Sequence, residues 1–348
     1  MNSTELGRRF GAAVALMAVL VAAAVAGADR PEVPVVTPVI LPLAGPAAAR
    51  NAEISGLDWS GDHLVLLPEN PDRFAAGDTL GFFVLPGAEI RAALEVGDGR
   101  PLAPRRLPCL APGLTRLIRG FDGLEAVAVA GDRVFLAVEA KQPGAMAGYL
   151  VGGRFEVEGG LVRVDVARRT PIPLDLDVFN LAAEALLADG DRIVAIVEAN
   201  GRNLRPQARA PVFNLDLEPL PSLPFPTIEY RVTDATALDA QRRFWVINYF
   251  FPPDEAKLLP ADDPEVAAHG TPSWFVPHGG FERLLELQIT AGGGIVRTET
   301  PPVWLAPARD GRLRNWEGLA RLDGRGFLLV TDEHPGTLLA FVPWPSDN

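Results

Sequence analysis

Apolar and polar positions alternate along this chain in short runs, and one arrangement of two apolar runs around a tight turn occurs five times. Apolar runs of this length, bounded by Gly, Asp and Asn, are typical of buried strands joined as hairpins. The five predicted hairpins are ISGLDWSGDHLVLLPEN (residues 54–70), LEAVAVAGDRVFLAVEA (124–140), AEALLADGDRIVAIVEAN (183–200), ATALDAQRRFWVINYF (235–250) and WEGLARLDGRGFLLVTDE (316–333).

The hairpins share a pattern at their start. A small residue follows the second position every time, and Leu or Val comes next. Equivalent positions are 70, 59, 52 and 81 residues apart, which is the size of one four-stranded blade. Repetition at this period predicts an all-β, five-bladed β-propeller, with six blades as the alternative. The small residues suit inner strands, where neighbouring blades approach closely.

Two further segments complete this architecture. The last repeat is one strand short, and VVTPVILPL (35–43) is expected to supply that strand from the N-terminal side. Such a closure removes an open sheet edge. The Pro-rich segment 252–280 is expected to be an insertion after the second strand of the fourth blade, either a structured lid over one face or a surface loop.

The N-terminal segment is a topogenic signal. Arg8 and Arg9 precede an uncharged apolar run from Phe10 to Ala28, and small residues precede Asp29. Residues 1–28 are therefore expected to be a cleaved signal peptide or a membrane anchor, with the propeller domain at 29–348. Either outcome places the folded part outside the cytoplasm, in the periplasm or secreted.

Composition narrows the function classes. The formal net charge is -12, which argues against a nucleic-acid partner because such partners need a basic surface. The single cysteine, Cys109, excludes an internal disulfide and a Cys-rich zinc site. A monomer that binds a small molecule or a protein on one propeller face is expected.

The repeated second position predicts a metal site. Inner strands begin at the central channel, so their first side chains converge there. Three carboxylates in a narrow channel repel one another and lose hydration, which a cation would relieve. Calcium suits oxygen ligands of flexible geometry best. Another cation, or a hydrogen-bonded ring filled with water, is the alternative. The predicted ligands are Ser55, Glu125, Glu184, Thr236 and Glu317.

A second set of polar residues follows where the second strand of each hairpin ends. These residues are expected to line a cleft at the channel mouth, or else to be turn residues in solvent. The set comprises Glu69, Glu139, Lys141, Glu198, Asn200, Asn248 and Asp332. Beside Asp332, the adjacent Glu333 and His334 are the candidate catalytic residues, with His334 as a general base.

The phrases SGL at Ser55, EGL at Glu317 and their equivalents resemble the SdiA-regulated and phytase-like (esterase-like) β-propeller families. Their order is also similar to the residues lining the calcium channel of soluble calcium-activated nucleotidases. This resemblance implies five blades and a central calcium near Glu125, Glu184 and Glu317. Ser55 and Thr236 would complete the ring, although Thr236 departs from the usual Ser.

The sequence is compatible with three functions. The first is a calcium-dependent hydrolase of phosphoesters or other esters, in which rim carboxylates activate water. The second is a non-catalytic propeller with structural calcium that binds a ligand or a protein. The third is a hydrolase of sugars or lactones that uses paired rim acids. The sequence holds no nucleophile elbow, HExxH or P-loop motif.

Overall fold

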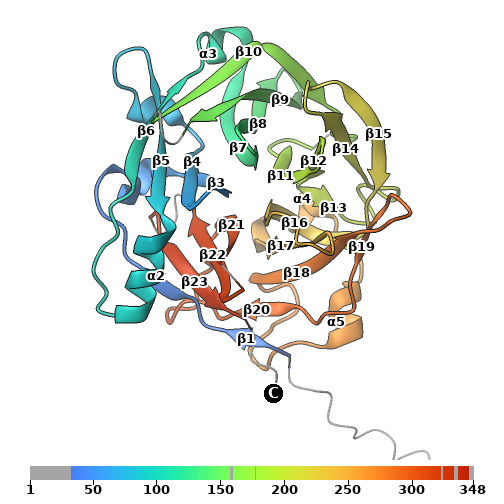
Figure 1. Cartoon of the computed structure of the whole chain (residues 1–348). Helices are drawn as coiled ribbons and strands as arrows, with labels where there is room; N and C mark the ends of the chain where they lie inside the picture. The colour runs from blue at the N-terminus through green and yellow to red at the C-terminus, as the bar shows by residue number, and fades with distance from the viewer. Residues whose placement is uncertain (1–32, 157–159, 177, 323, 333–335, 345–348) are drawn as a thin grey trace, which may run out of the picture. The chain divides into compact units, whose positions relative to one another are not determined.

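Five inner strands surround a central axis in the computed structural model, which describes residues 33–156, 160–176, 178–322, 324–332 and 336–344. Neighbouring inner strands contact one another in the order β3, β7, β11, β16, β21 and back to β3 (Figure 1). The ring confirms the predicted five-bladed propeller, and the alternative of six blades is wrong. The segment 1–28, predicted as signal or anchor, lies outside the described residues.

Within each blade neighbouring strands are mostly antiparallel and follow one another outward from the axis, in chain order except for the outermost strand of the fifth blade. The outermost strands of the first two blades pair in parallel and join these blades into one sheet. The first two blades consist of β3 (Ile54–Ser60), β4 (His63–Pro68), β5 (Leu80–Pro86), β6 (Arg105–Leu110), then β7 (Phe121–Ala130), β8 (Arg133–Gln142), β9 (Ala145–Glu156) and β10 (Leu161–Ile172). The third consists of β11 (Ala183–Asp189), β12 (Arg192–Val197), β14 (Arg209–Asn214) and β15 (Pro219–Pro224).

The fourth blade consists of β16 (Ile228–Ala235), β17 (Arg243–Phe250) and β18 (Phe281–Ile289), which pairs with both β19 (Ile295–Arg297) and β20 (Val303–Leu305). A short β13 (Ala199–Asn200) pairs with β16 from the third blade's side. The fifth blade consists of β21 (Trp316–Leu322), β22 (Gly326–Thr331), β23 (Leu339–Pro343) and β2 (Val39–Leu41).

The N-terminal segment closes the ring, as the hydrophobic pattern predicts. β2 pairs antiparallel with β23 and becomes the outer strand of the fifth blade. The preceding β1 (Val35–Val36) instead pairs in parallel with β20 of the fourth blade. The predicted strand 35–43 is thus divided between two blades around Pro38, which has no N–H to donate to a ladder.

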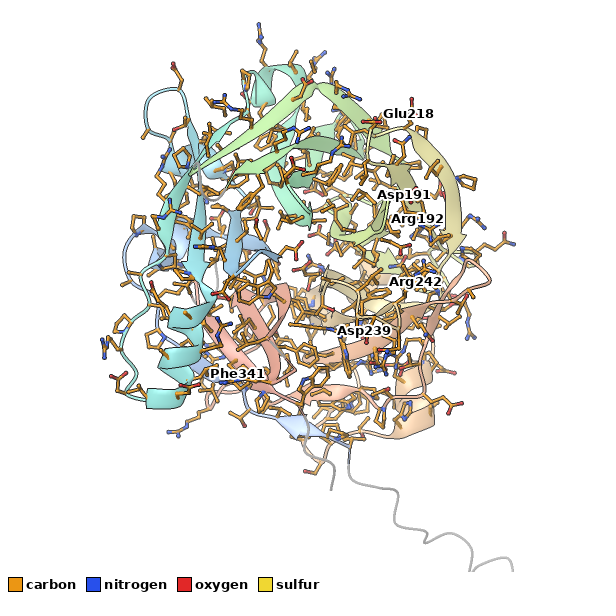
Figure 2. The ribbon with its side chains drawn as sticks, viewed as in Figure 1. Asp191, Arg192, Glu218, Asp239, Arg242 and Phe341 are labelled. Atoms are coloured by element: carbon orange, nitrogen blue, oxygen red, sulfur yellow. The ribbon has the colours of Figure 1, made fainter. Side chains whose placement is uncertain are left out.

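Close packing of the inner strands explains the small residues of the repeat. A Cβ added to Gly318 would lie 2.5 Å from Val330 Cγ1 and 2.9 Å from Leu57 Cγ. The fifth and first blades can approach this closely only with glycine there. Side chains fill the space between blades elsewhere, and Arg192 of the third blade and Arg242 of the fourth lie near each other (Figure 2). Both donate to Asp189, at 2.8 Å and 2.6 Å.

Helices lie between blade strands. The repeat analysis did not anticipate α2, whose periodicity falls outside the aligned hairpins. None of the helices in the described ranges is long and apolar enough to cross a membrane. They are η1 (Pro46–Ala48), η2 (Arg50–Ala52), η3 (Pro71–Phe74), α2 (Gly87–Val96), α3 (Leu114–Leu117), η4 (Pro252–Asp254), α4 (Glu255–Leu258) and α5 (Pro264–His269).

Residues 251–280 connect β17 to β18 and carry η4, α4 and α5. The Asp263 side chain caps α5 by accepting from the N–H of Glu265, and its other oxygen pairs with Arg283 at 2.8 Å. Arg283 is fully buried and donates to Asn248 at 2.8 Å. This segment is therefore fastened to the fourth blade at the end where β16 begins.

Candidate cation site in the central channel

β-Bulges occur at the start of the inner strands and set the direction of the channel residues. The strand register shifts between Ile54 and Gly56, and equivalent shifts occur in the second, third and fifth blades. A bulge leaves one residue out of the ladder and re-aims its side chain. The residues left out are four of the five predicted metal ligands: Ser55, Glu125, Glu184 and Glu317.

In the fourth blade the residue at the bulge is not Thr236, the remaining predicted ligand. Its register shifts between Val232 and Ala235, so Thr233 and Asp234 occupy the bulge. Thr236 lies beyond the end of β16, three residues further along the chain than Thr233. The prediction at Thr236 is therefore wrong about position, because this hairpin has a longer turn than the other four.

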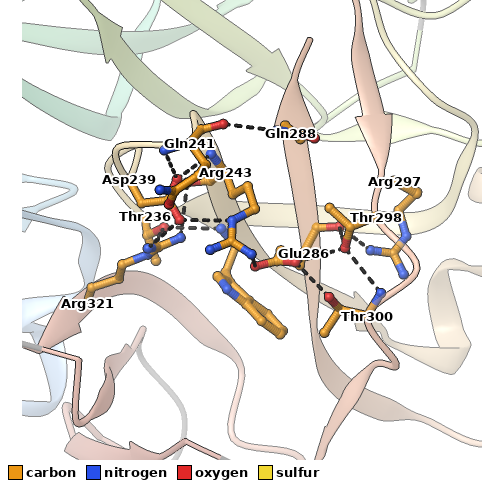
Figure 3. A network of polar contacts seen from close by, with 11 residues as sticks. Thr236, Asp239, Gln241, Arg243, Glu286, Gln288, Arg297, Thr298, Thr300 and Arg321 are labelled. Carbon is orange, nitrogen blue, oxygen red and sulfur yellow. Dashed lines mark hydrogen bonds and ion pairs between the residues drawn. The ribbon is translucent and has the colours of Figure 1, made fainter.

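Thr236 belongs to a polar network at the hairpin turns (Figure 3). Its hydroxyl accepts from the N–H of Trp245 at 3.1 Å and from Arg321 at 3.3 Å. Asp239 in the same network pairs with Arg243 at 3.0 Å and Arg321 at 3.4 Å. These bonds join the fourth and fifth blades and give Thr236 a structural role.

The two hydroxyl residues at the bulges connect neighbouring blades. Ser55 donates to the carbonyl of Leu124, the residue before Glu125. Thr233 donates to the carbonyl of Trp316, the residue before Glu317, at 2.8 Å. This equivalence confirms that Thr233 is the counterpart of Ser55. Deeper in the channel, Asp234 accepts from the N–H of Leu319 at 2.6 Å.

The bulge carboxylates are buried in an acidic surrounding. Glu125 and Glu184 are each 8% exposed, and no hydrogen-bond donor reaches either carboxylate from the described residues. Burial raises the pKa of both well above the usual range, and neighbouring acids raise it further. The pKa of Glu317 is raised by burial and then by Asp332. Without a cation, this arrangement must hold protons.

Glu69 directly follows β4, Glu139 lies near the end of β8, and both lie close to the bulge carboxylates. Burial raises the pKa of Glu69 to about 8, with Asp332 and Glu53 adding to the effect. Burial and then Glu198 raise the pKa of Glu139 to about 7. A Cβ on Gly123 would lie 2.5 Å from Glu69 Cγ and 2.6 Å from Glu125 Oε1. The missing side chain at Gly123 leaves the space that these two carboxylates share.

A tighter acidic group stands at the edge of the mouth. One carboxylate oxygen each from Glu53, Glu69 and Asp332 lies within 4.8 Å of the others. Asn315 donates to Asp332 at 3.3 Å and to Glu317 at 2.8 Å, which links this group to the bulge ring. Sequence reasoning missed Glu53, because it precedes the hairpin phrase.

Arg231 is the cation that the sequence did not reveal. Its guanidinium pairs with Glu198 and packs over the ring of Tyr249 at 5.6 Å. A second nitrogen lies 3.8 Å from Asp254 of η4. Glu198 is fully buried, and its Oε2 has no hydrogen-bond partner in the described part of the chain. One unpartnered carboxylate oxygen therefore remains beside the channel.

Two predicted mouth residues have structural roles instead. Asn200 accepts from buried Arg205 at 2.6 Å, and Asn248 donates to the carbonyls of Glu229 and Arg231. Lys141 pairs with Asp122 at 2.7 Å, and its charge lowers the pKa of the neighbouring Glu139. The residue after Asn248, Tyr249, is the true counterpart of Glu69, since Asn248 pairs with Val232 just before the bulge. Glu333 and His334 lie outside the described residues.

A pocket of about 750 Å³ lies beside the mouth. Its wall includes Gly148, whose register partner on β8 is Glu139. Apolar side chains of Met146 and Leu174 line it together with polar Asp175 and Asn203. The pocket places a mixed apolar and polar surface next to an acid with a raised pKa.

Comparison with known proteins gives little beyond the fold. No family model matches the chain, and no curated protein matches it. Similar solved structures include a mutant of Cellvibrio cellulosa alpha-L-arabinanase, at 12% identity and TM-score 0.49 over 86% of this chain and 95% of that one. A putative glycosidase from Bacteroides thetaiotaomicron has 10% identity and TM-score 0.46 over 92% and 96%.

The catalytic domain of Coprinopsis cinerea GH62 alpha-L-arabinofuranosidase is similar at 10% identity and TM-score 0.44, over 88% of this chain and 95% of that one. These structures are glycosidases, so the resemblance to SdiA-regulated and phytase-like families is corrected. That resemblance rested on short motifs such as SGL and EGL. Any inner strand that has a bulge and packs closely against the next blade favours such a motif. Likeness at this level assigns no activity.

Proposed function

We propose that the channel mouth binds a calcium ion, with Glu125, Glu184 and Glu317 as its ligands and Glu198 Oε2 within the same acidic surrounding. The observation that carries the proposal is the unpartnered, fully buried oxygen of Glu198 beside the carboxylates of Glu125 and Glu184, which accept no hydrogen bond from the described residues. A buried carboxylate oxygen without a partner is costly unless a proton or a cation satisfies it.

The donor set fits a hard cation. Every candidate ligand is oxygen, the hydroxyls of Ser55 and Thr233 retain acceptor lone pairs, and Gly123 leaves room where Glu69 and Glu125 meet. Calcium accepts such mixed oxygen ligands in flexible geometry, whereas zinc favours nitrogen and sulfur. When bound, calcium would polarise an oxygen atom of a ligand or of water.

The charge of the mouth bears on the substrate class. Glu69, Glu139, Glu198 and Asp332 repel a phosphate group, and the arginines beside them, Arg231 and Arg73, are already paired with Glu198 and Glu53. This charge disfavours the hydrolysis of phosphoesters. An uncharged ligand is compatible with this mouth.

Hydrolysis of an uncharged glycoside is a second proposal that rests on a specific observation. Glu69 and Glu139 have pKa values raised to about 8 and about 7, so each can hold a proton at neutral pH. Glycosidases need one protonated carboxyl as general acid and one ionised carboxylate. The neighbouring pocket of about 750 Å³ has room for a ligand beside Glu139. A non-catalytic ligand-binding propeller with structural calcium is the alternative.

The site of action is proposed from the N-terminal sequence. Arg8 and Arg9 before an apolar run favour export, and calcium is abundant outside the cytoplasm. An exported protein would meet calcium at concentrations that even a weak site can bind.

Calorimetric titration with calcium tests the metal proposal. Glu125→Gln and Glu184→Gln should each weaken calcium affinity at least tenfold, while the exposed Glu299→Gln serves as the matched control. Unchanged affinity in both channel variants would refute the site.

A panel of uncharged aryl glycosides, carboxylic esters and aryl phosphates then tests catalysis. Turnover of a glycoside that is lost in Glu139→Gln would support hydrolysis. Calcium binding without turnover of any substrate would favour the non-catalytic alternative.

A further inference from the structure

Three arginines form a row across the second blade. Arg133 on β8 is the register partner of Arg154 on β9, and Arg154 is the register partner of Arg163 on β10. Directly opposed residues on neighbouring strands point to the same side of a sheet. The three guanidinium groups therefore extend from one surface, with their strands about 4.8 Å apart.

The row is unfavourable in the protein alone. Like charges directly opposite one another destabilise a sheet. Arg133 pairs with Asp216 of the third blade at 3.3 Å, and Arg154 pairs with Asp132. Arg163 is exposed and has no carboxylate within ion-pair distance among the described residues. In a chain with net charge -12, three aligned arginines are an uncommon concentration of positive charge.

The row forms one wall of a surface pocket of about 410 Å³. Arg168 also lines it, and Arg168 is held by the carbonyl of Asp216 at 3.2 Å. Four arginines thus face two aspartates, Asp165 and Asp216. Gly152 and Gly153 also line the pocket, and a Cβ on Gly153 would lie 2.0 Å from the carbonyl oxygen of Arg163, so glycine lets β9 and β10 approach closely here.

This pocket is separate from the channel mouth. Arg133 stands at the start of β8 and Glu139 near its end, six residues apart, which corresponds to about 20 Å along a strand. The pocket therefore lies toward the hairpin turns, at the opposite end of the blade from the acidic mouth. A ligand bound there would not occupy the channel site.

We propose that this arginine pocket binds a multiply charged phosphate-type oxyanion. Guanidinium groups donate paired hydrogen bonds that match the oxygens of such anions. An anion placed along the row would neutralise the repulsion between neighbouring arginines and would take up the free donors of Arg163. The same chemistry is offered by a free pyrophosphate and by the phosphate headgroups of an anionic lipid.

Calorimetry with sodium pyrophosphate at constant ionic strength, on the full chain without added divalent cation, tests this proposal. Saturable binding is expected, and Arg154→Gln/Arg163→Gln should weaken it at least tenfold. Arg312→Gln is the matched control, because Arg312 is 78% exposed and pairs only locally with Asp310. Without the anion, the double variant should melt no lower than the wild type, since removing like charges relieves repulsion.

Co-sedimentation with phosphatidylglycerol vesicles distinguishes the two sources. Binding to vesicles but not to pyrophosphate, again lost in the double variant, would assign the pocket to lipid headgroups. Absence of both interactions, or binding that the double variant leaves unchanged, would overturn the proposal.

Discussion

Arg231 pairs with one oxygen of Glu198, and the other oxygen of that buried carboxylate has no hydrogen-bond partner among the described residues. The pair connects the channel with the 251–280 segment, because Arg231 also lies 3.8 Å from Asp254. Arg231 therefore stands beside six carboxylates of the mouth, those of Glu69, Glu125, Glu139, Glu184, Glu198 and Glu317, while Arg73 and Lys141 add positive charge near Glu69 and Glu139. The remaining negative charge is what a bound cation would neutralise.

Removing this internal cation should make the protein more dependent on calcium. Arg231→Gln leaves Glu198 buried without its partner, and loss of one member of a buried pair costs about 3 kcal/mol or more. We expect a lower melting temperature in chelator and a larger rise on adding calcium than in the wild type. Differential scanning calorimetry with and without calcium measures both. An equal calcium-induced rise in the two proteins would contradict the proposed electrostatic link.

The pH dependence of stability should differ with and without calcium. Glu69 has a pKa raised to about 8 and Glu139 to about 7 in the folded, cation-free protein. The folded state holds these protons more strongly than the unfolded chain, so the stabilisation is lost as pH rises through 7 to 8. The melting temperature in chelator should fall between pH 5 and pH 8.5.

Calcium should remove most of that fall, because it favours the ionised carboxylates. Part of the fall in melting temperature should persist, because Asp58 titrates outside the metal site. Burial raises the pKa of Asp58 to about 7, and this carboxylate accepts a backbone hydrogen bond from Val129, away from the mouth. Thermal melts across this pH range in both conditions provide the check. A profile that calcium leaves unchanged would place the titrating acids outside the metal site.

Gly123 should be required for metal binding. The Cβ of Gly123→Ala would collide with Glu69 and Glu125, at 2.5 Å and 2.6 Å from their atoms. We expect calcium affinity to fall at least tenfold, with the fold retained because the two side chains can move away. Gly294→Ala is the control, since its Cβ would meet no atom closer than 3.9 Å. Equal calcium affinity in the two variants, measured by titration, would count against the shared space.

Variants of two threonines test whether the channel residue of the fourth blade lies at the bulge or in the neighbouring turn. Thr233→Val removes the hydrogen bond to Trp316 and should lower the free energy of unfolding by about 1 kcal/mol. It should also weaken calcium binding, whereas Thr236→Val should leave calcium affinity unchanged. Chemical denaturation and calcium titration of both variants decide between the two registers. A loss of calcium affinity in Thr236→Val alone would show that Thr236, and not Thr233, is the channel residue.

The repeat was sufficient to predict four of the five inner strands and the closure of the ring. The inner strand of the fourth blade, β16, instead ends at Ala235, where the predicted hairpin 235–250 begins. LAAEALLA has the composition of a helix, yet Ala183–Asp189 forms β11 because its position between neighbouring blades outweighs local propensity. Four of five channel residues followed from the same alignment, since a bulge at a fixed place in each hairpin gives a fixed sequence offset.

The remaining errors have local physical causes. The fourth hairpin turns over more residues, as the bonds between Asp239 and Arg243 indicate, so aligning on the turn displaced Thr233 to Thr236. Asn200 and Asn248 follow the pattern of mouth residues in the sequence, but their side-chain oxygens accept hydrogen bonds from buried arginines. Arg231 and Glu53 lie outside the aligned phrases, and only the folded chain brings them to the channel.

Metal analysis of the protein purified without added calcium tests the central claim most directly. Plasma mass spectrometry before and after dialysis against chelator should find about one calcium per chain, and removing it should lower the melting temperature, since a ligand of the native state stabilises it. The same measurement on Glu184→Gln should find substantially less calcium. A protein that contains no calcium, takes up none on titration and melts identically in chelator would contradict the account.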